Sequence, residues 1–162
     1  MVLCNGSVHI ELAKLRFIQK LLANLMLGPA VARLSSKHTF ARNIKNIYFD
    51  SDQITQVEID AMWALMEYNC GRKTLSQVAQ YPKERYKFWH RWIGALQNTQ
   101  LPIKVIWAMN DPIAVPKIGK TIADEVQNSE LVELKKLGHF PMLESPEVWS
   151  TAVIQSLQKH FL

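Results

Sequence analysis

Two short apolar runs in the last third of the chain predict the strands of a parallel sheet. The first covers residues 103–108 and is interrupted only by Lys104, and the second covers residues 131–134. Between them, a helix is predicted that begins near Pro116 and has apolar side chains at helical spacing. A strand, a helix and a second strand in this order form a right-handed parallel crossover unit, with helices covering the sheet.

The front of the chain predicts one more strand and a long helical region. Residues 1–5 (MVLCN) form a short apolar run that the Asn5–Gly6 turn signal ends. Apolar side chains at helical spacing then predict a helix from Glu11 to Leu27, closed by Gly28–Pro29. Short helices joined by loops are expected over residues 31–49.

The pattern predicts further helices up to residue 96. Thr55, with Glu58 three residues later, is the sequence signature of a capping box, and Gly71 is expected to end that helix. A short helix is expected over residues 74–81, and a longer one over residues 83–96. The expected buried face of the first of these helices contains Ile59, Met62, Trp63, Met66 and Cys70, and that of the last contains Tyr86, Trp89, Ile93 and Leu96.

Composition places the chain among soluble globular domains. Of its 162 residues, 48% are hydrophobic and 20% are charged, which is enough apolar material for one domain with a core. The two cysteines provide no disulfide framework, and no Cys/His cluster has the spacing of metal ligands, so we expect neither a metal nor a cofactor. A reducing, cytoplasmic location is the simplest expectation, with neither a signal peptide nor a membrane-spanning segment.

The net charge of +5 is concentrated in the front of the chain. Residues 1–100 contain 13 Lys/Arg and 7 Asp/Glu, against 6 and 7 in residues 101–162. A basic half of this kind is compatible with nucleic acid or an acidic membrane surface. The basic residues occur singly along amphipathic segments, and no nucleic-acid-binding module is present, so solvated helix faces explain them and no nucleic-acid partner is expected.

Asp111 and His139 are the candidate catalytic pair. Each follows a predicted strand, and the carboxyl ends of parallel strands meet at one edge of a sheet. An imidazole can take a proton from a hydroxyl nucleophile, and a carboxylate on its other nitrogen fixes the tautomer. Taken alone, His139 also fits a surface loop, and Asp111 also fits the turn signal Asn110–Asp111–Pro112.

The residues around this pair resemble the carboxyl-terminal signature of the α/β-hydrolase superfamily. The resemblance rests on IKVIWAMNDPIAVP, from residue 103, and LVELKKLGHFPMLESPEVW, from residue 131. In that fold the order of the triad is nucleophile, acid, histidine. The resemblance therefore implies that Asp111 is the triad acid and His139 the triad base. Ala108 stands where the family usually has glycine.

The resemblance also implies the domain organisation. Residues 5–22 and 87–96 look most like the haloalkane dehalogenase and epoxide hydrolase-like branch. Residues 1–9 would be the core strand that precedes the cap, residues 10–98 the helical cap, and residues 99–162 the carboxyl-terminal α/β core. The fold class expected is thus α/β, the carboxyl-terminal part of an α/β-hydrolase fold with an all-helical cap and without the first five strands.

In such a cap, a group of aromatic residues is expected to line the pocket of a small apolar substrate. The alternative for each of them is a place in the internal core of the cap. The residues concerned are Trp63, Phe88, Trp89 and Trp92 in the cap, and Phe140 beside His139.

No Gly-x-Ser-x-Gly occurs in the chain, and no comparable turn presents a nucleophilic aspartate. The oxyanion-hole loop of the family is also missing. We therefore expect a partial hydrolase, acting on a small apolar ester, epoxide or haloalkane when complete and inactive alone. The alternative is a non-catalytic remnant or interaction protein that uses the exposed sheet edge or the basic cap, with self-association through the unpaired strand.

Overall fold

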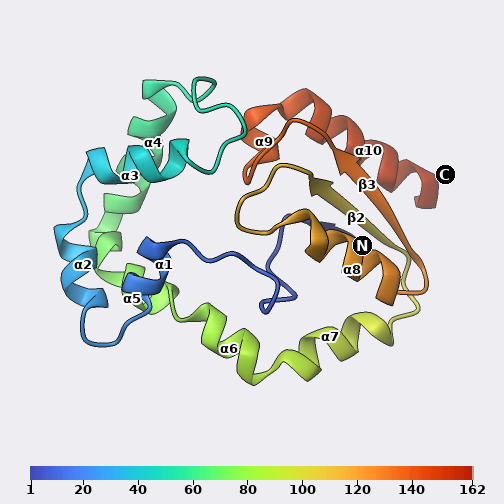
Figure 1. Ribbon diagram of the computed structural model, residues 1–162. Helices are drawn as coiled ribbons and strands as arrows, with labels where there is room; N and C mark the ends of the chain where they lie inside the picture. The colour runs from blue at the N-terminus through green and yellow to red at the C-terminus, as the bar shows by residue number, and fades with distance from the viewer. Residues whose placement is uncertain (162) are drawn as a thin grey trace.

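The computed structural model describes residues 1–161, with side chains described through residue 158. Three parallel strands form one sheet in the order β1 (Val2–Cys4), β2 (Ile103–Ala108) and β3 (Ser129–Leu134). Leu3 lies opposite Val105, which in turn lies opposite Leu131. The expected α/β class with a parallel sheet is confirmed (Figure 1). We use the word cap for the helical segment of residues 10–98, between β1 and β2.

Ten α-helices and one 3-10 segment, η1, complete the described part of the chain. Helices α1–α7 and η1 lie between β1 and β2, α8 connects β2 to β3, and α9 and α10 follow β3. Their bounds are α1 Phe17–Leu22, α2 Gly28–Leu34, α3 Lys37–Lys45, α4 Gln56–Glu67, η1 Tyr68–Thr74, α5 Leu75–Val78, α6 Tyr81–Lys87, α7 Trp89–Gln97, α8 Pro116–Glu125, α9 Pro141–Glu144 and α10 Pro146–Phe161.

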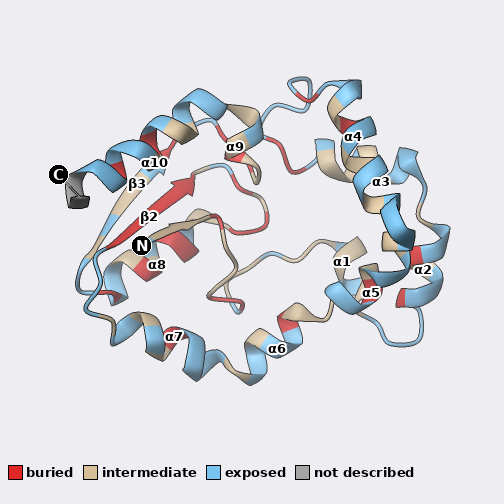
Figure 2. Cartoon of the chain, turned by 180° about the vertical axis from the view of Figure 1, so that it is seen from behind, coloured by how far each residue is buried: buried red, intermediate tan, exposed pale blue. Residues whose placement is uncertain are grey.

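Strand β2 is the centre of the core, because every one of its residues is buried (Figure 2). Alternate side chains of a strand point to opposite faces of the sheet. One face of β2, with Val105 and Trp107, packs against Ile118 and Ile122 of α8. The other face, with Ile106, packs against residues of α10. The sheet is therefore covered on both sides, as a parallel sheet requires.

Lys104 is the polar exception inside this strand. Its side chain is buried and forms an ion pair with Glu130 on the neighbouring strand β3. Burying an ammonium group without a partner is costly, so the pairing with Glu130 makes the position possible. The sequence predicted a strand across Lys104 because the residues on both sides of it are apolar.

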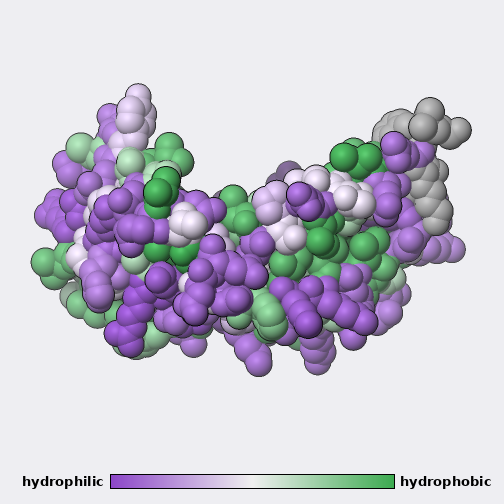
Figure 3. All heavy atoms as spheres, turned by 90° about the horizontal axis from the view of Figure 1, so that it is seen from above, coloured by the Kyte–Doolittle hydropathy of each residue, from purple (hydrophilic) through white to green (hydrophobic). Residues whose placement is uncertain are grey.

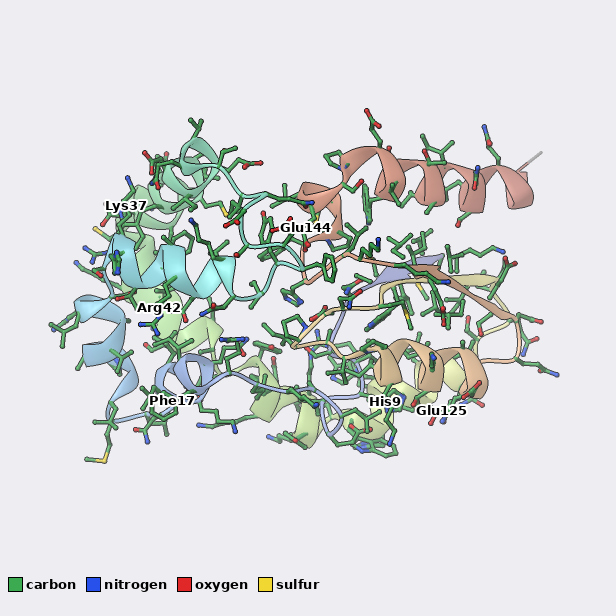
Figure 4. The ribbon with its side chains drawn as sticks, turned by 45° about the horizontal axis from the view of Figure 1, so that its top comes forward. His9, Phe17, Lys37, Arg42, Glu125 and Glu144 are labelled. Atoms are coloured by element: carbon green, nitrogen blue, oxygen red, sulfur yellow. The ribbon has the colours of Figure 1, made fainter. Side chains whose placement is uncertain are left out.

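The segment after β1 is fixed to the core by a buried histidine. His9 Nδ1 lies 2.7 Å from Glu11 Oε1, and His9 Nε2 lies 3.0 Å from Glu125 Oε2 at the end of α8 (Figure 4). Gln97 Nε2 of α7 donates to the same Glu125 oxygen at 3.2 Å. This cluster joins the start of the cap, the end of α7 and the end of α8.

The cap has a small core of its own, and that core includes one residue of the acid loop. Ile47, Ile54 and Ile59 cluster with Ile113, which lies two residues after Asp111. Figure 1 shows the cap helices curving away from the sheet and returning to it through α6 and α7. The cap is therefore packed against the carboxyl edge of the strands, where Asp111 and His139 lie.

The predicted helix over residues 11–27 is wrong in its extent. Only α1 forms there, and it has no buried residue. The backbone N–H of Lys14 donates to Ile113 O at 2.9 Å, which holds this part of the chain against the acid loop in a non-helical path. Asn24 then ends the helical run, and Gly28 begins α2 where it was expected to close a helix.

The predicted helix over residues 83–96 is divided into α6 and α7. Phe88, with φ −112° and ψ 21°, leaves helical geometry between them, so the predicted apolar stripe is not continuous. Ile93 is buried, as expected, whereas Tyr86 and Trp89 are exposed. The capping box of Thr55 and Glu58 is confirmed, although α4 ends at Glu67, before the expected Gly71.

Cys70 was expected on the buried face of the helix that Thr55 caps. It lies instead in η1, exposed, where Asn69 and Cys70 adopt left-handed φ values of 49° and 61°. Residues in this region of φ interrupt a right-handed helix, so position 70 does not continue the face that contains Ile59.

Candidate active site

Asp111 occupies a turn directly after β2, and its side chain is fully buried. Its Oδ1 accepts hydrogen bonds from the backbone N–H groups of Ile113 (2.7 Å) and Ala114 (2.9 Å). Trp107 fixes the same turn, because its Nε1–H donates to Ala114 O at 2.8 Å. The short Asx-type turn that the sequence predicted thus also holds the carboxylate in one orientation.

The second oxygen of Asp111 accepts a hydrogen bond from Asn5. Asn5 Nδ2 donates to Asp111 Oδ2 at 2.7 Å, and Asn5 Oδ1 accepts from the backbone N–H of Ala108 at 2.9 Å. The residue adopts φ 36°, a left-handed conformation that asparagine tolerates better than most residues. Sequence analysis assigned Asn5 only to a turn; its contact with Asp111 is tertiary, and no local pattern indicates it.

His139 lies in the loop after β3 and contacts the same oxygen. Its Nδ1 lies 2.8 Å from Asp111 Oδ2. An ionised carboxylate only accepts hydrogen bonds, so Nδ1 carries the proton and Nε2 has the free lone pair. The His139 side chain is 24% exposed, whereas that of Asp111 is 0% exposed. Among the described residues no hydrogen bond to Nε2 is present, which leaves this atom able to accept a proton.

The histidine loop is tied to the cap through its backbone. The N–H of His139 donates to Ile47 O at 2.9 Å. A Cβ on Gly138 would lie 2.5 Å from Ile47 O and 2.6 Å from Phe49 N, so only glycine allows this close approach. The Gly138 that the sequence placed before His139 is therefore required by the packing of the cap.

Glu144 of α9 is a second link between the cap and the histidine loop. Its Oε2 accepts from the backbone N–H of Phe49 at 2.8 Å, and its Oε1 accepts from Gly138 at 2.9 Å and from Phe140 at 3.3 Å. In Figure 4, Glu144 lies where α9 approaches the loop that follows α3. One carboxylate thus joins three backbone groups from two parts of the fold.

The acid turn and the histidine loop are also joined directly. The backbone N–H of Asn110 donates to Leu137 O at 3.1 Å, and Asn110 Oδ1 accepts from the N–H of Lys136 at 3.0 Å. Lys136 has φ 57°, which turns the chain sharply after β3. The distance between Asp111 and His139 is therefore set by the two loops that carry them.

The five aromatic residues expected to line a pocket lie in different parts of the fold. Phe140 is next to the histidine, with its ring centroid 5.1 Å from that of His139. Trp63 packs against Phe40 inside the cap at 5.6 Å, and Phe88 lies under the Lys87 ammonium at 5.2 Å. The remaining pair is exposed: Trp89 and Trp92.

Trp92 borders a cavity along β1 on the α7 side. This cavity has a volume of about 610 Å³ and is lined by Leu3 and Val8 of the β1 region and by Leu96 and Leu101 of the α7 region. Of the five aromatic residues, Phe140 is the one with a ring contact to His139 among the described residues. The pocket-lining role of all five stays a prediction.

Two further groups near the site have perturbed pKa values. Burial, followed by the nearby charges of Glu58 and Glu144, raises the pKa of Tyr48 to about 12. The Tyr48 hydroxyl is buried and, within the described residues, has no hydrogen-bond partner. Burial likewise raises the pKa of the Cys4 thiol, whose Sγ accepts a hydrogen bond from Trp149 Nε1 at 3.4 Å.

In the part of the chain that the structure describes, no helix is long and apolar enough to cross a bilayer. No cluster of three or more His, Cys, Asp or Glu side chains in the same part of the chain has the arrangement of a metal site.

Comparison with known proteins places the chain beside proteins about twice its length. It is 35% identical over 156 residues to LipZ of Mycobacterium tuberculosis, which is classed provisionally as a hydrolase, covering 96% of this chain and 54% of LipZ. It is 30% identical over 149 residues to the mesoderm-specific transcript protein of Mus musculus, covering 90% of this chain and 44% of that protein. No protein-family model matches the chain.

Solved structures agree in fold. A thermophilic esterase from Thermogutta terrifontis superimposes with a TM-score of 0.70 at 18% identity, covering 98% of this chain and 55% of the esterase. The chain spans about half the length of the curated relatives it matches.

Proposed function

Because the chain is related to the α/β hydrolases and has the fold of their carboxyl-terminal part, we propose that it carries two members of a hydrolytic triad. In this proposal His139 is the general base and Asp111 the acid that orients it. The observation that carries the proposal is the 2.8 Å contact between His139 Nδ1 and the fully buried Asp111 carboxylate. The substrate class proposed is a small apolar ester, epoxide or haloalkane.

The geometry supports a proton transfer at His139 Nε2. With the Nδ1 proton held by Asp111, the lone pair of Nε2 can take the proton of an attacking hydroxyl group or of water. The imidazolium that results lies beside a carboxylate, which stabilises its charge. The proton then leaves from Nε2 to the departing alcohol when an ester is cleaved, and the neutral imidazole is restored.

The nucleophile of this reaction would come from polypeptide outside residues 1–162. No Gly-x-Ser-x-Gly is present in the sequence, and the relatives contain about as much additional chain as they share with this one. The type of nucleophile decides the chemistry: a serine gives an acyl-enzyme with esters, and an aspartate gives an alkyl ester with epoxides or haloalkanes.

The test compares the 162-residue chain with the longest polypeptide from its source that contains this sequence. The 162-residue chain should not hydrolyse p-nitrophenyl acetate, whereas a longer form with a nucleophile should. In that longer form His139→Ala and Asp111→Asn should each lower kcat by ~10²-fold or more. His90→Ala, which changes an exposed histidine of α7, is the matched control and should leave kcat unchanged. Turnover by the pure short chain that is lost on His139→Ala would contradict the expectation that the nucleophile comes from outside it. A longer form whose kcat is unchanged by His139→Ala would contradict the role of His139.

A non-catalytic role is the second candidate, and one observation favours it. In the described part of the chain β1 pairs with β2 alone, and the cavity of about 610 Å³ runs along this strand. A strand with one unpaired edge can pair there with a strand from another polypeptide. A short chain that is inactive but purifies as a stable complex or oligomer, with pairing abolished by Leu3→Pro, would favour this role.

A further inference from the structure

The turn that joins α1 to α2 exposes three consecutive large apolar side chains. Leu25, Met26 and Leu27 are 75%, 89% and 52% exposed. Phe17 at the start of α1 and Leu34 at the end of α2, the two helices that this turn joins, are also exposed, at 75% and 84%. Single exposed apolar residues are ordinary, but five of them within eighteen residues of one helical hairpin require an explanation. We call these five residues the apolar tip.

Hydrogen bonds hold the tip in this conformation. Asn24 Oδ1 accepts from the backbone N–H groups of both Met26 and Leu27 at 2.9 Å. The N–H of Gly28 donates to Asn24 O at 2.8 Å, and a Cβ at position 28 would lie 2.2 Å from Leu22 O. The turn is thus closed against α1, and the apolar side chains are left pointing away from the cap.

Gln80, between α5 and α6, and Lys83 of α6 hold the turn from the side of the cap. Gln80 Nε2 donates to Ala23 O at 3.0 Å, and Lys83 Nζ donates to the same oxygen at 3.1 Å. These bonds anchor the turn to the body of the cap and place a lysine ammonium beside it. The exposure of Leu25 and Met26 is therefore a property of the folded cap and does not depend on a loose loop.

The sequence around the tip is basic and contains no acid. Residues 12–49 contain seven Lys/Arg and no Asp or Glu. The one ion pair of this stretch among the described side chains joins Lys37, at the start of α3, to Asp60 of α4. Lys20 and Arg33 lie in the last turns of α1 and α2, the two helices that carry the tip.

The tip lies at the end of the molecule farthest from the carboxyl terminus (Figure 1). In Figure 4, Phe17 and Arg42 lie on this end of the cap, away from the sheet. Figure 3 shows apolar and hydrophilic residues interspersed over the cap end. The sheet edge of β1 and the loops of Asp111 and His139 are elsewhere, so the tip remains free whatever pairs with β1.

We propose that the apolar tip, with the cations around it, docks the protein on the surface of an anionic lipid bilayer. Apolar side chains that enter the headgroup region, surrounded by Lys and Arg, are the features of interfacial membrane binding. A second copy of the chain fits less well, because two tips in contact would bring together two segments that both lack acids. Non-specific binding of nucleic acid rests on phosphate contacts by the cations and does not require the exposed Leu and Met side chains. The proposal is independent of the hydrolytic role.

The test is co-sedimentation of the purified 162-residue chain with lipid vesicles at low ionic strength. Vesicles of phosphatidylcholine with an equal part of phosphatidylglycerol should sediment the protein, and vesicles of phosphatidylcholine alone should sediment far less. Met26→Asp should weaken binding to the anionic vesicles by roughly tenfold. Leu65→Asp is the matched control, because Leu65 is 77% exposed on α4, outside the acid-free stretch, and this variant should bind like the wild type.

A second variant separates the electrostatic contribution. Lys20→Glu, on the surface of α1, should weaken binding to anionic vesicles and flatten its dependence on salt, because it removes one cation and adds one anion. Circular dichroism of each variant establishes that the fold is retained.

Four results would overturn the proposal. The first is no sedimentation with anionic vesicles, and the second is sedimentation that Met26→Asp and Leu65→Asp change equally. The third is a concentration-dependent dimer that Met26→Asp abolishes while vesicle binding is absent, which would assign the tip to self-association. Binding of duplex DNA that Met26→Asp leaves intact, without vesicle binding, would assign the basic surface to nucleic acid.

Discussion

Asn5 and Asp111, which are 106 positions apart in the sequence, are joined by a 2.7 Å hydrogen bond from Asn5 Nδ2 to Asp111 Oδ2. The oxygen that receives this bond is the one that His139 Nδ1 also contacts. The Asp111 carboxylate therefore accepts from two side chains and two backbone N–H groups, and its position depends on β1 as well as on its own loop.

Replacing Asn5 should destabilise the fold. Asn5→Ala removes a hydrogen bond to a buried carboxylate and the acceptor of the Ala108 N–H. It also places alanine at φ 36°, a left-handed conformation that alanine tolerates less well than asparagine. Hydrogen bonds to charged groups contribute about 1.5–3 kcal/mol, so we expect the free energy of unfolding to fall by about 2–3 kcal/mol in urea titrations. Asn5→Gly removes the same bonds without the backbone strain and should cost less. Equal stability of all three proteins would show that the bond contributes nothing.

Gly138→Ala should be one of the most damaging small substitutions in the chain. The added methyl group would lie within 2.6 Å of backbone atoms of both Ile47 and Phe49, which cannot move without separating the cap from the histidine loop. We expect a loss of about 3 kcal/mol or more in chemical unfolding. Gly94→Ala is the matched control: nothing lies within 4 Å of a Cβ there, and the position is inside α7. That change should stabilise the protein by about 0.5–1 kcal/mol. Similar effects at both positions would contradict the packing described.

Tyr48→Phe should stabilise the protein. The Tyr48 hydroxyl is buried without a hydrogen-bond partner among the described residues, and an unsatisfied buried polar group costs about 1–3 kcal/mol. Phenylalanine keeps the edge contact of the ring with Phe140, at 6.2 Å between centroids. We expect a higher melting temperature in differential scanning calorimetry. A lower melting temperature would mean that the hydroxyl has a stabilising partner, such as ordered water.

The capping box of α4 should make stability depend on pH. Hydrogen bonds from the backbone and side chain of Thr55 lower the pKa of Glu58 below its usual value of 4.5. A lowered folded-state pKa means that the stabilisation is present above the unfolded-state pKa and is lost as pH falls through the folded-state value. Glu58→Gln should therefore lower stability at neutral pH, by about 0.3–1 kcal/mol, and make no difference in acid. A mutational difference that is the same at both pH values would rule out the ionised carboxylate as its source.

The crossover from Ile103 to His139 was predictable because its signals are local. The apolar run of β2, Pro116 at the start of α8 and the turn at Asn110–Asp111 each depend on neighbouring residues, and all point to the same fold. The meeting of Asp111 and His139 then followed from the rule that parallel strands end at a common edge.

The cap was predicted less well because its helices are shaped by distant contacts. Helical spacing continues through residues 11–27, yet Lys14 bonds to Ile113 and Asn24 bonds to the backbone of its own turn, so the helix is cut at both ends. Phe88 likewise divides α6 from α7 at a position with no Gly or Pro signal. The role of Asn5 was hidden for the same reason, since its partner is in a different part of the chain.

The placement of the whole cap between two paired strands also determines an order of assembly. Pairing β1 with β2 closes a loop of residues 5–102, whereas pairing β2 with β3 closes a loop of residues 109–128 only. The longer closure costs roughly 1.4 kcal/mol more chain entropy. The β2–α8–β3 unit should therefore form early, and β1 should join last, bringing Asn5 to Asp111 as the final step. Folding would thus finish at the residue that completes the acid, so that the carboxylate gains its last hydrogen bond only when the entire cap is in place.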